Sequence, residues 1–136
     1  MPSGACCSVR LLADTHTLLW WLMADSALSA AAQAALCDPA NEIYISAAVA
    51  WEIATKSRQG KLHIEPEEAG RLAQTIAAEG FRPLTLTVDH ALRAGSYRQA
   101  HGDPFDRMLA AQCELEDLTL VTRDPAFRNF PCRTLW

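Results

Sequence analysis

The sequence predicts a single α/β domain with a mostly parallel central sheet. Two observations predict this fold. Short apolar runs of strand length alternate with longer helical stretches along the chain. Acidic residues follow directly after such runs, where open parallel sheets form their sites. The 136 residues, half of them hydrophobic, are enough for one domain with its own core over residues 9–136.

The first part of the chain is expected to form a strand, two helices and a second strand. The apolar run at residues 9–13 is the first strand, and residues 15–23 follow as an apolar helix. Ser29 has the short hydroxyl side chain of an N-cap, which predicts a second helix to residue 37. After a loop, residues 43–45 form the second strand.

Two helices occupy the middle of the chain. Ser46 is expected to cap a helix that runs to about residue 57 and is ended by Gly60. Pro66, followed by two glutamates, is a good first turn for another helix, expected to continue to about Glu79. Together these segments give the helical layer that follows the second strand.

The last part of the chain returns to the strand and helix alternation. Residues 83–86 and 118–122 are expected strands, and residues 132–136 are an expected edge strand. Residues 87–97 form a helix between them. A further helix opens at Asp103-Pro104 and runs to about residue 116, because proline suits the first helical position.

The composition indicates a cytoplasmic protein without a disulfide framework. The five cysteines are odd in number, lack zinc-ligand spacing and are expected to be reduced thiols. No signal peptide or membrane-spanning run is visible, and residues 1–8 are expected to be a flexible N-terminal tail. The cysteines are Cys6, Cys7, Cys37, Cys113 and Cys132.

The formal net charge of −4 counts against a general nucleic-acid-binding surface, because such surfaces are usually basic. It does not exclude a local site. Acids that hold divalent cations lower the formal charge, and two bound divalent ions would cancel it. Any nucleic-acid site must therefore consist of bound metal and a few basic side chains.

Four acidic residues fall where a catalytic site is expected. Asp14 follows the first strand and Asp124 follows the fourth, so their carboxylates lie close together if those strands are neighbours. Glu52 is a lone acid in the apolar stretch at residues 47–54, where burying an unpaired carboxylate would cost several kcal/mol. Asp106 lies in the first turn of the last helix.

Each acid also has a purely structural interpretation. Asp14 and Asp103 can cap the helices that follow them, and Asp124 with its proline can form an ordinary turn. Glu52 can pair with Lys56 four residues on, a contact worth roughly a few tenths of a kcal/mol. Clustered carboxylates, however, repel one another unless a cation neutralises them. An all-oxygen cluster suits Mg²⁺ or Mn²⁺, so together the acids predict a metal site.

Four short motifs appear in order along the chain. They are residues 11–16 (Leu-Leu-Ala-Asp-Thr-His) with residues 19–22, residues 46–56 around Trp51-Glu52 with residues 60–62, residues 101–112 beginning His-Gly-Asp-Pro-Phe-Asp, and residues 120–124 (Leu-Val-Thr-Arg-Asp). Their order and spacing resemble PIN-domain toxins of the VapC type, over residues 11–136. One motif alone is weak, whereas the four together are specific.

The resemblance implies a three-layer α/β/α fold, PIN-like, around a mostly parallel sheet. It also implies a Mg²⁺- or Mn²⁺-dependent endoribonuclease that is the toxin of a toxin–antitoxin pair. The family's catalytic, metal-binding acids carry over to Asp14, Glu52, Asp106 and Asp124, with Asp103 as a further candidate ligand. The family's hydroxyls beside the metal carry over to Thr15 and Thr122.

The resulting hypothesis is hydrolysis of RNA phosphodiesters by metal-activated water. Asp14, Asp106 and Asp124 hold one or two ions, while Glu52 completes the cage or orients the water. Arg107 and Arg123 adjoin these acids and are candidates for contact with RNA phosphates, although both also suit an ordinary protein surface.

Other functions were weighed against this one. A stand-alone PIN nuclease in RNA processing is the alternative within the same fold. A receiver-like signalling domain would need paired acids after the first strand, and a phosphatase with an aspartyl nucleophile would need an acid at position 16, which is His16. A non-enzymatic interaction module is the remaining class. RNA cleavage that requires Mn²⁺ and is stopped by a chelator separates these alternatives from a nuclease.

Residues 18–23 are more apolar than one buried helix stripe requires, which predicts an exposed groove for a partner. The resemblance implies a cognate antitoxin whose C-terminal segment lies in such a groove. It also implies a toxin homodimer, and a heterotetramer or larger assembly with the antitoxin. Trp21→Ala is therefore expected to weaken antitoxin binding more than metal binding.

Overall fold

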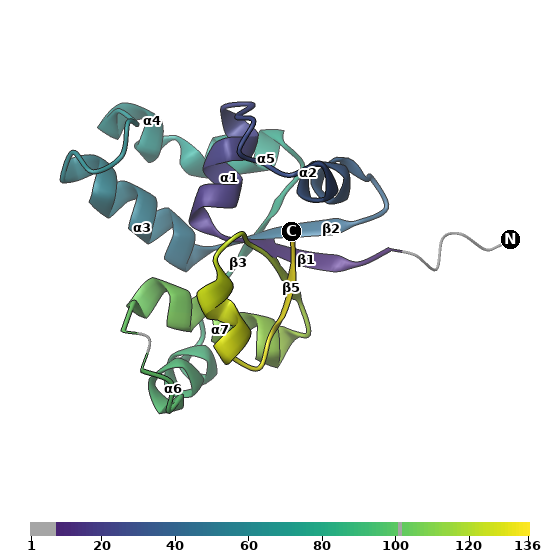
Figure 1. Ribbon diagram of the computed structural model, residues 1–136. Helices are drawn as coiled ribbons and strands as arrows, with labels where there is room; N and C mark the ends of the chain where they lie inside the picture. The colour runs from purple at the N-terminus through teal and green to yellow at the C-terminus, as the bar shows by residue number, and fades with distance from the viewer. Residues whose placement is uncertain (1–7, 101) are drawn as a thin grey trace, which may run out of the picture.

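The computed structural model describes residues 8–100 and 102–136. Within these residues five strands, all parallel, form one sheet in the order β3-β2-β1-β4-β5 (Figure 1). This sheet confirms the predicted fold class. The strands are β1 (Arg10–Ala13), β2 (Glu42–Ser46), β3 (Arg82–Leu84), β4 (Thr119–Val121) and β5 (Arg133–Leu135).

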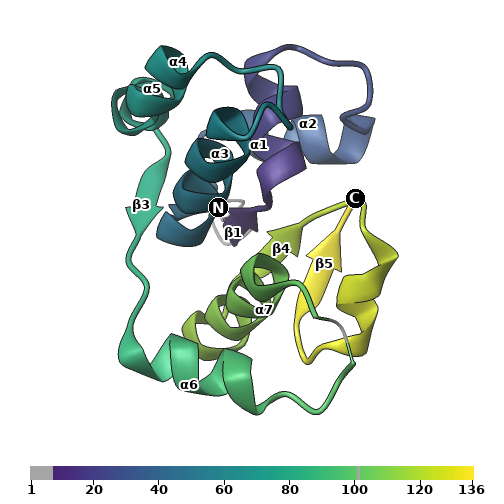
Figure 2. The same cartoon turned by 90° about the vertical axis from the view of Figure 1, so that its left-hand side faces the viewer.

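Helices cover both faces of the sheet, as the burial of a parallel sheet requires. Figures 1 and 2 show α1 to α5 on one side of the strands and α6 and α7 on the other. The central strand is enclosed by both layers, since Leu11, Leu12 and Ala13 are fully buried. The helices are α1 (Thr15–Leu22), α2 (Ala30–Cys37), α3 (Ala47–Arg58), α4 (Pro66–Gly70), α5 (Leu72–Ala78), α6 (Val88–Ser96), α7 (Pro104–Glu116) and the 3₁₀ helix η2 (Pro125–Asn129).

The predicted helix boundaries rest on side chains that do cap the helices. The Ser29 hydroxyl accepts a hydrogen bond from the Ala32 amide, and the Ser46 hydroxyl accepts one from Ala48. At the end of α3, Gly60 adopts a φ of +71°, a conformation that a residue with a side chain rarely takes. Local chemistry therefore fixes where α2 and α3 begin and where α3 ends.

The structure corrects three boundaries. The single helix expected over residues 66–79 is two helices, α4 and α5, that break at Gly70 and Arg71, where glycine gives the helix little support. β3 begins one residue earlier and ends two earlier than the expected strand at residues 83–86. The turn expected at Asp124 extends into η2, because burying Phe127 holds that segment on the core.

Some expectations concern residues outside the described part of the chain. The predicted tail at residues 1–8, with Cys6 and Cys7, lies there except for Ser8, which is exposed. The cysteines of the described part are free thiols at positions 37, 113 and 132. Across the described residues, no helix is both long and apolar enough to cross a bilayer.

The strand order creates a switch point beside β1. The chain passes from β1 outwards to β2 and β3, and then continues on the other side of β1 with β4 and β5. Val121 pairs with Ala13, and the Asp14 amide donates to the Val121 carbonyl at 3.3 Å. The strands that precede Asp14 and Asp124 are therefore neighbours, as expected, and they open at the same edge.

Candidate metal centre at the C-terminal edge of the sheet

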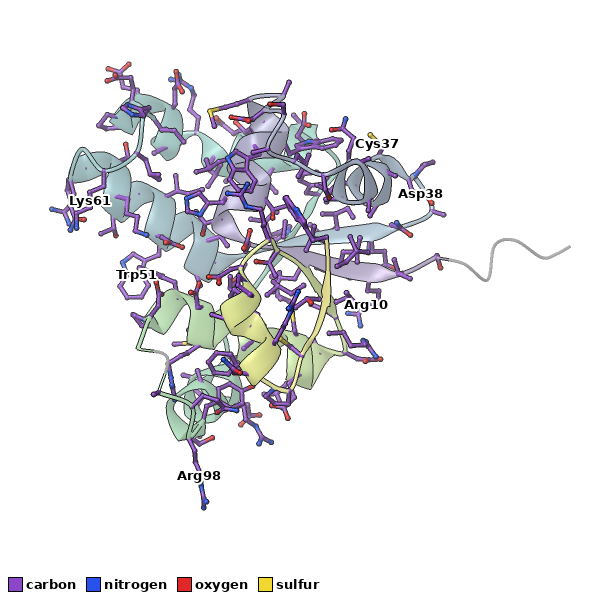
Figure 3. The ribbon with its side chains drawn as sticks, viewed as in Figure 1. Arg10, Cys37, Asp38, Trp51, Lys61 and Arg98 are labelled. Carbon is purple, nitrogen blue, oxygen red and sulfur yellow. The ribbon has the colours of Figure 1, made fainter. Side chains whose placement is uncertain are left out.

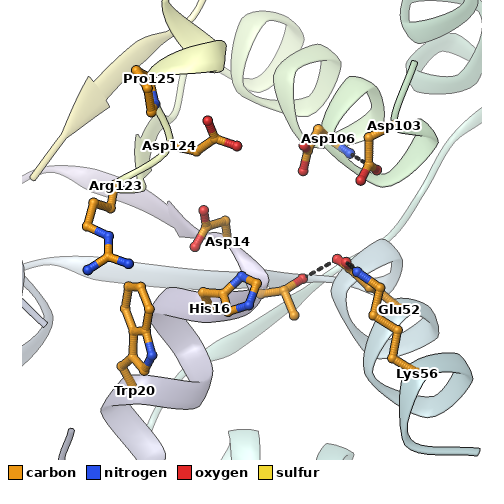
Figure 4. Close-up of a pocket in the computed structure, with 11 residues that line it drawn as sticks. Asp14, His16, Trp20, Glu52, Lys56, Asp103, Asp106, Arg123, Asp124 and Pro125 are labelled. Atoms are coloured by element: carbon orange, nitrogen blue, oxygen red, sulfur yellow. Dashed lines mark hydrogen bonds and ion pairs between the residues drawn. The ribbon is translucent and has the colours of Figure 1, made fainter. Parts of the chain in front are cut away.

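A cavity of about 450 Å³ lies at the C-terminal edge of β1 and β4. It is bounded by the start of α1, by α3, by the start of α7 and by the segment after β4 (Figure 4). All five acids singled out from the sequence line it. The lining residues are Asp14, Thr15, His16, Trp20, Glu52, Lys56, Asp103, Asp106, Arg123, Asp124 and Pro125.

Asp14 both caps α1 and lines the cavity, the two roles that the sequence suggested for it. Its Oδ1 accepts a hydrogen bond from the Thr17 amide at 2.9 Å and so caps α1. Its Oδ2 accepts one from the Thr122 hydroxyl at 2.5 Å, and that hydroxyl also accepts from the Asp124 amide. Capping therefore fixes the orientation of a carboxylate that faces the cavity, and the two interpretations do not compete.

Glu52 is 5% exposed, and it is not left without partners. The Thr15 hydroxyl donates to Oε1 at 2.5 Å, and the Lys56 ammonium forms an ion pair with Oε2. Hydrogen bonding to Glu52 and the negative charges of Asp103 and Asp106 raise the pKa of Lys56, against the opposite effect of its burial. Lys56 therefore carries a firmly held positive charge at the cavity wall.

Asp103 and Asp106 lie at the N-terminus of α7. Oδ1 of Asp103 accepts hydrogen bonds from the amides of Phe105 and Asp106, so Asp103 is the N-cap. Asp106 sits in the first turn, and Figure 4 shows its carboxylate directed towards Asp14 across the cavity. The N-terminus of α7 is the positive end of the helix dipole, so it stabilises the negative charges of Asp103 and Asp106.

Asp124 and Arg123 form the wall opposite α3. The Asp124 Oδ1 accepts from the Ala126 amide at 2.9 Å and caps η2. The Arg123 guanidinium lies over the Trp20 ring, 4.5 Å from its centroid, which holds a cation at the cavity edge. Trp20 in turn contacts the rings of His16 and Trp136.

Arg107 has a different environment from the one suggested by its place in the sequence. Its guanidinium donates to the carbonyls of Ala94, Tyr97 and Gln99, and it does not line the cavity. It joins the end of α6 to α7. Of the two arginines that adjoin the acids in the sequence, Arg123 alone lines the cavity.

The cavity lining is strongly acidic. Five carboxylates face two cationic side chains, so with His16 neutral the formal excess is three negative charges. Among residues 8–100 and 102–136, no three His, Cys, Asp or Glu side chains already stand close enough to hold an ion. The five acids of the lining nonetheless offer oxygen donors and outnumber the cations, which fits the ligand preference of Mg²⁺ or Mn²⁺.

Sequence reasoning missed the cavity positions of Lys56, His16 and Trp20. It treated Lys56 as a helix-surface partner of Glu52, and the ion pair exists, but the pair also lines the cavity. The spacing of four residues between Glu52 and Lys56, and between His16 and Trp20, places each pair on one helix face. That spacing could have indicated that Lys56 lies beside Glu52, and Trp20 beside His16.

A sequence model of the PIN domain matches residues 11–131, a span that contains every residue of the cavity. The chain belongs to the PIN-domain family. PIN domains are generally ribonucleases and typically depend on metal ions. Membership in this family excludes the receiver-like and phosphatase interpretations. The search of curated proteins found no match to the chain.

Solved structures share the fold of this PIN domain at low sequence identity. VapBC2 of Rickettsia felis, bound to a DNA fragment of its promoter, has 15% identity and a TM-score of 0.68, covering 94% of this chain and 99% of that one. DNA-bound VapBC of Salmonella typhimurium has 16% identity and a TM-score of 0.71, covering 93% and 97%. A toxin–antitoxin complex of Klebsiella pneumoniae has 24% identity and a TM-score of 0.61, covering 93% and 96%.

Proposed function

We propose that this PIN domain is a Mg²⁺- or Mn²⁺-dependent endoribonuclease that acts in the cytoplasm as the toxin of a toxin–antitoxin pair. The observation that carries the proposal is that Asp14, Asp106 and Asp124 line one cavity in which five carboxylates outnumber two cationic side chains. The membership in a family of ribonucleases supports the choice of reaction.

Asp14, Asp106 and Asp124 would hold the ion or ions, with Asp103 as a further ligand. A divalent ion bound there supplies a more acidic water and a positive charge that stabilises the transition state of an in-line displacement at phosphorus. The water oxygen forms the new bond to phosphorus and the 3′-oxygen leaves, which gives a 5′-phosphate and a 3′-hydroxyl.

The chain's own residues orient the reacting groups. Thr122 holds the Asp14 carboxylate, while Thr15 and Lys56 hold that of Glu52. Because both Glu52 oxygens have partners, this carboxylate is fixed in direction and suits the orientation of the attacking water. Arg123, held over Trp20, is placed to contact a phosphate beside the one that is cleaved.

The charge of the cavity explains why an ion is needed before RNA can enter. Without it, a phosphodiester anion would approach an excess of three negative charges. One divalent ion would leave a single negative charge, and two would reverse the sign. Metal binding and substrate binding are therefore expected to be coupled.

The antitoxin is proposed to occupy a groove of about 490 Å³ between α1, α3, α4 and α5, lined by seven apolar and five polar residues. Trp21 does not line it, because its indole nitrogen donates to Glu79 and its ring packs on Phe81. A homodimer, and a heterotetramer or larger assembly with antitoxin, remain part of the proposal. The apolar lining residues are Leu19, Leu22, Met23, Ile53, Ile64, Ala69 and Leu72.

The decisive experiment replaces single carboxylates by amides. Asp14→Asn and Asp106→Asn keep side-chain size and remove the charge. Asn can still cap α1 at position 14, although Asp14→Asn also replaces the carboxylate oxygen that accepts from the Thr122 hydroxyl. Each variant is expected to lose about a hundredfold or more of the Mn²⁺-dependent cleavage of RNA, measured on gels with and without chelator. The matched control is Asp117→Asn at an exposed site, expected to cleave normally.

Two results would contradict the proposal. Wild-type protein that leaves RNA intact in both Mg²⁺ and Mn²⁺ would refute the nuclease. Full activity in Asp106→Asn would remove Asp106 as a ligand and transfer its role to Asp103. A gene pair in which a short upstream product neutralises the activity separates the toxin from a stand-alone nuclease in RNA processing.

A further inference from the structure

An exposed aromatic pair adjoins the acidic cavity where α3 meets α7. Trp51 packs against Phe105 in a T-shaped arrangement, with ring centroids 4.9 Å apart and an interplanar angle of 70°. Trp51 is 57% exposed and Phe105 is partly buried. Among the described residues, Trp51 is the only Trp, Tyr or Phe side chain that is more than half exposed. Figure 3 shows it at the margin of the molecule between the two helices.

The sequence neighbours of this pair connect it to the cavity. Trp51 directly precedes Glu52, and Phe105 directly precedes Asp106, and both of these acids line the cavity. Neither ring is itself part of the cavity lining, but each lies one residue along its helix from an acid that is. Arg123 and Trp20 lie on the opposite side of the same cavity (Figure 4).

Along the exposed face of α3, small side chains flank the Trp51 indole. The residues one helical turn before and after it on the exposed face of α3 are Ala47 and Ala54, both small and exposed. Trp20, the other large ring at the cavity, already has Arg123 over it. An accessible aromatic ring near a polar cavity offers a flat face on which a planar group can stack.

Because the chain has a net negative charge, a stacked base would be an important source of RNA-binding affinity. The net charge is −4, and only Lys56 and Arg123 bring positive charge to the cavity. Contacts with phosphates therefore supply little affinity, in contrast to most nucleic-acid-binding proteins. Stacking of a base on an aromatic ring needs no positive charge and tolerates any base.

We propose that Trp51, supported by Phe105, is the stacking platform for a nucleobase next to the phosphate that is cleaved. This inference rests on the proposed nuclease function and adds a base-binding subsite to it. Stacking requires an unpaired base, so the strand that crosses the cavity must be open at this position. Trp51 here is a binding residue and takes no part in proton transfer.

The test measures the affinity of a labelled single-stranded oligoribonucleotide by fluorescence anisotropy in Ca²⁺, with gels confirming that the strand stays intact. An abasic residue is placed at each position in turn. For wild type, one position is expected to lower the affinity about tenfold when its base is removed. Trp51→Ala should bind the intact strand about tenfold more weakly and become indifferent to the base at that position.

Two further variants test whether the loss of the aromatic ring causes the weaker RNA binding of Trp51→Ala. Trp51→Phe keeps a ring and should retain most of the affinity and the base dependence. Leu92→Ala removes an exposed apolar side chain on α6, 67% exposed and distant in sequence from the cavity, and should bind as wild type does. The loss in Trp51→Ala should also persist at high salt, because stacking is not screened as phosphate contacts are.

Mn²⁺-dependent cleavage of RNA by wild type and by Leu92→Ala separates this inference from the proposed function. Leu92→Ala should cleave RNA at the wild-type rate. A wild-type protein that cannot cleave RNA contradicts the nuclease, whereas the abasic scan, which requires binding and no cleavage, still decides the platform. An unchanged scan in Trp51→Ala overturns the platform, and a change in oligomeric state without loss of RNA affinity overturns it and assigns Trp51 to a protein interface.

Discussion

The buried carboxylate of Glu52 shows how a single residue serves the packing and the site together. It lies in the apolar face of α3 and would be costly to bury alone. Thr15 from α1 and Lys56 from the next turn of α3 satisfy its two oxygens. The sequence predicted the acid and its i, i+4 partner, while the Thr15 contact, 37 residues away, depends on how α1 packs on α3.

Replacing Lys56 by Gln tests this arrangement. The change leaves a buried carboxylate without its cation, and because Lys56 is itself partly exposed the cost is expected to be about 1–2 kcal/mol. In chelator this should lower the melting temperature by about 3–6 °C. In Mn²⁺ the loss should shrink, since an ion in the cavity supplies the missing charge. The control is Lys61→Gln on the exposed loop after α3, which should melt as wild type does.

An Lys56→Gln variant that melts like wild type in chelator would show that the ion pair contributes nothing measurable. A loss of equal size with and without Mn²⁺ would show that the ion does not reach Glu52.

At the scale of elements, the apolar residues of α1 and its C-cap lie in four different surroundings. Leu18 and Leu19 are in the core. Trp20 lines the cavity, and Trp21 packs on Phe81 and Glu79. Met23, at the end of the helix, is 56% exposed in the groove proposed for the antitoxin. The composition of this segment predicted an apolar surface, but only the structure shows which side chains form it.

The groove is therefore better tested at Met23 than at Trp21. Met23→Glu places a charge in the groove at an exposed site, so folding should be unaffected and binding of an antitoxin segment should weaken about tenfold or more. The probe is the protein encoded by a short gene adjacent to the gene of this PIN domain, and its affinity is measured by isothermal titration calorimetry. Val88→Glu, an exposed apolar site on α6, is the control. Equal affinity of wild type and Met23→Glu would place the partner elsewhere.

For the whole molecule, the cavity joins segments that lie far apart in the chain. Asp14 comes from the first strand, Glu52 from one helical layer, Asp106 from the other, and Asp124 from beyond the last central strand. An ion that draws these carboxylates together also holds both layers on the sheet. Metal binding should therefore stabilise the whole fold and not one element only.

Thermal melts provide the measurement. At Mn²⁺ about a hundredfold above its dissociation constant, the native state gains about 2.7 kcal/mol, and the wild-type melting temperature should rise by several degrees. Asp14→Asn and Asp106→Asn should show a smaller rise. In chelator these variants should be as stable as wild type or more so, because like-charge repulsion is relieved. The same rise in wild type and both variants would be incompatible with a metal centre at these residues.

The sequence by itself determined the order of strands and helices, the N-caps at Ser29, Ser46 and Asp103, and the positions of the acids after strands. These features depend on neighbouring residues, whose spacing and chemistry can be read along the chain. Even there, the break at Gly70 was missed, because a single weak position does not interrupt an otherwise helical pattern.

Only the tertiary structure decided which side chains meet. Trp51 on Phe105, Arg123 over Trp20 and Thr122 on Asp14 join residues 54 to 108 positions apart along the chain. No local periodicity encodes such a contact, since each depends on the strand order and on how two layers pack across the sheet. The acids were visible in the sequence as separate signals, and it is the packing around β1 and β4 that gathers them into one charged cavity.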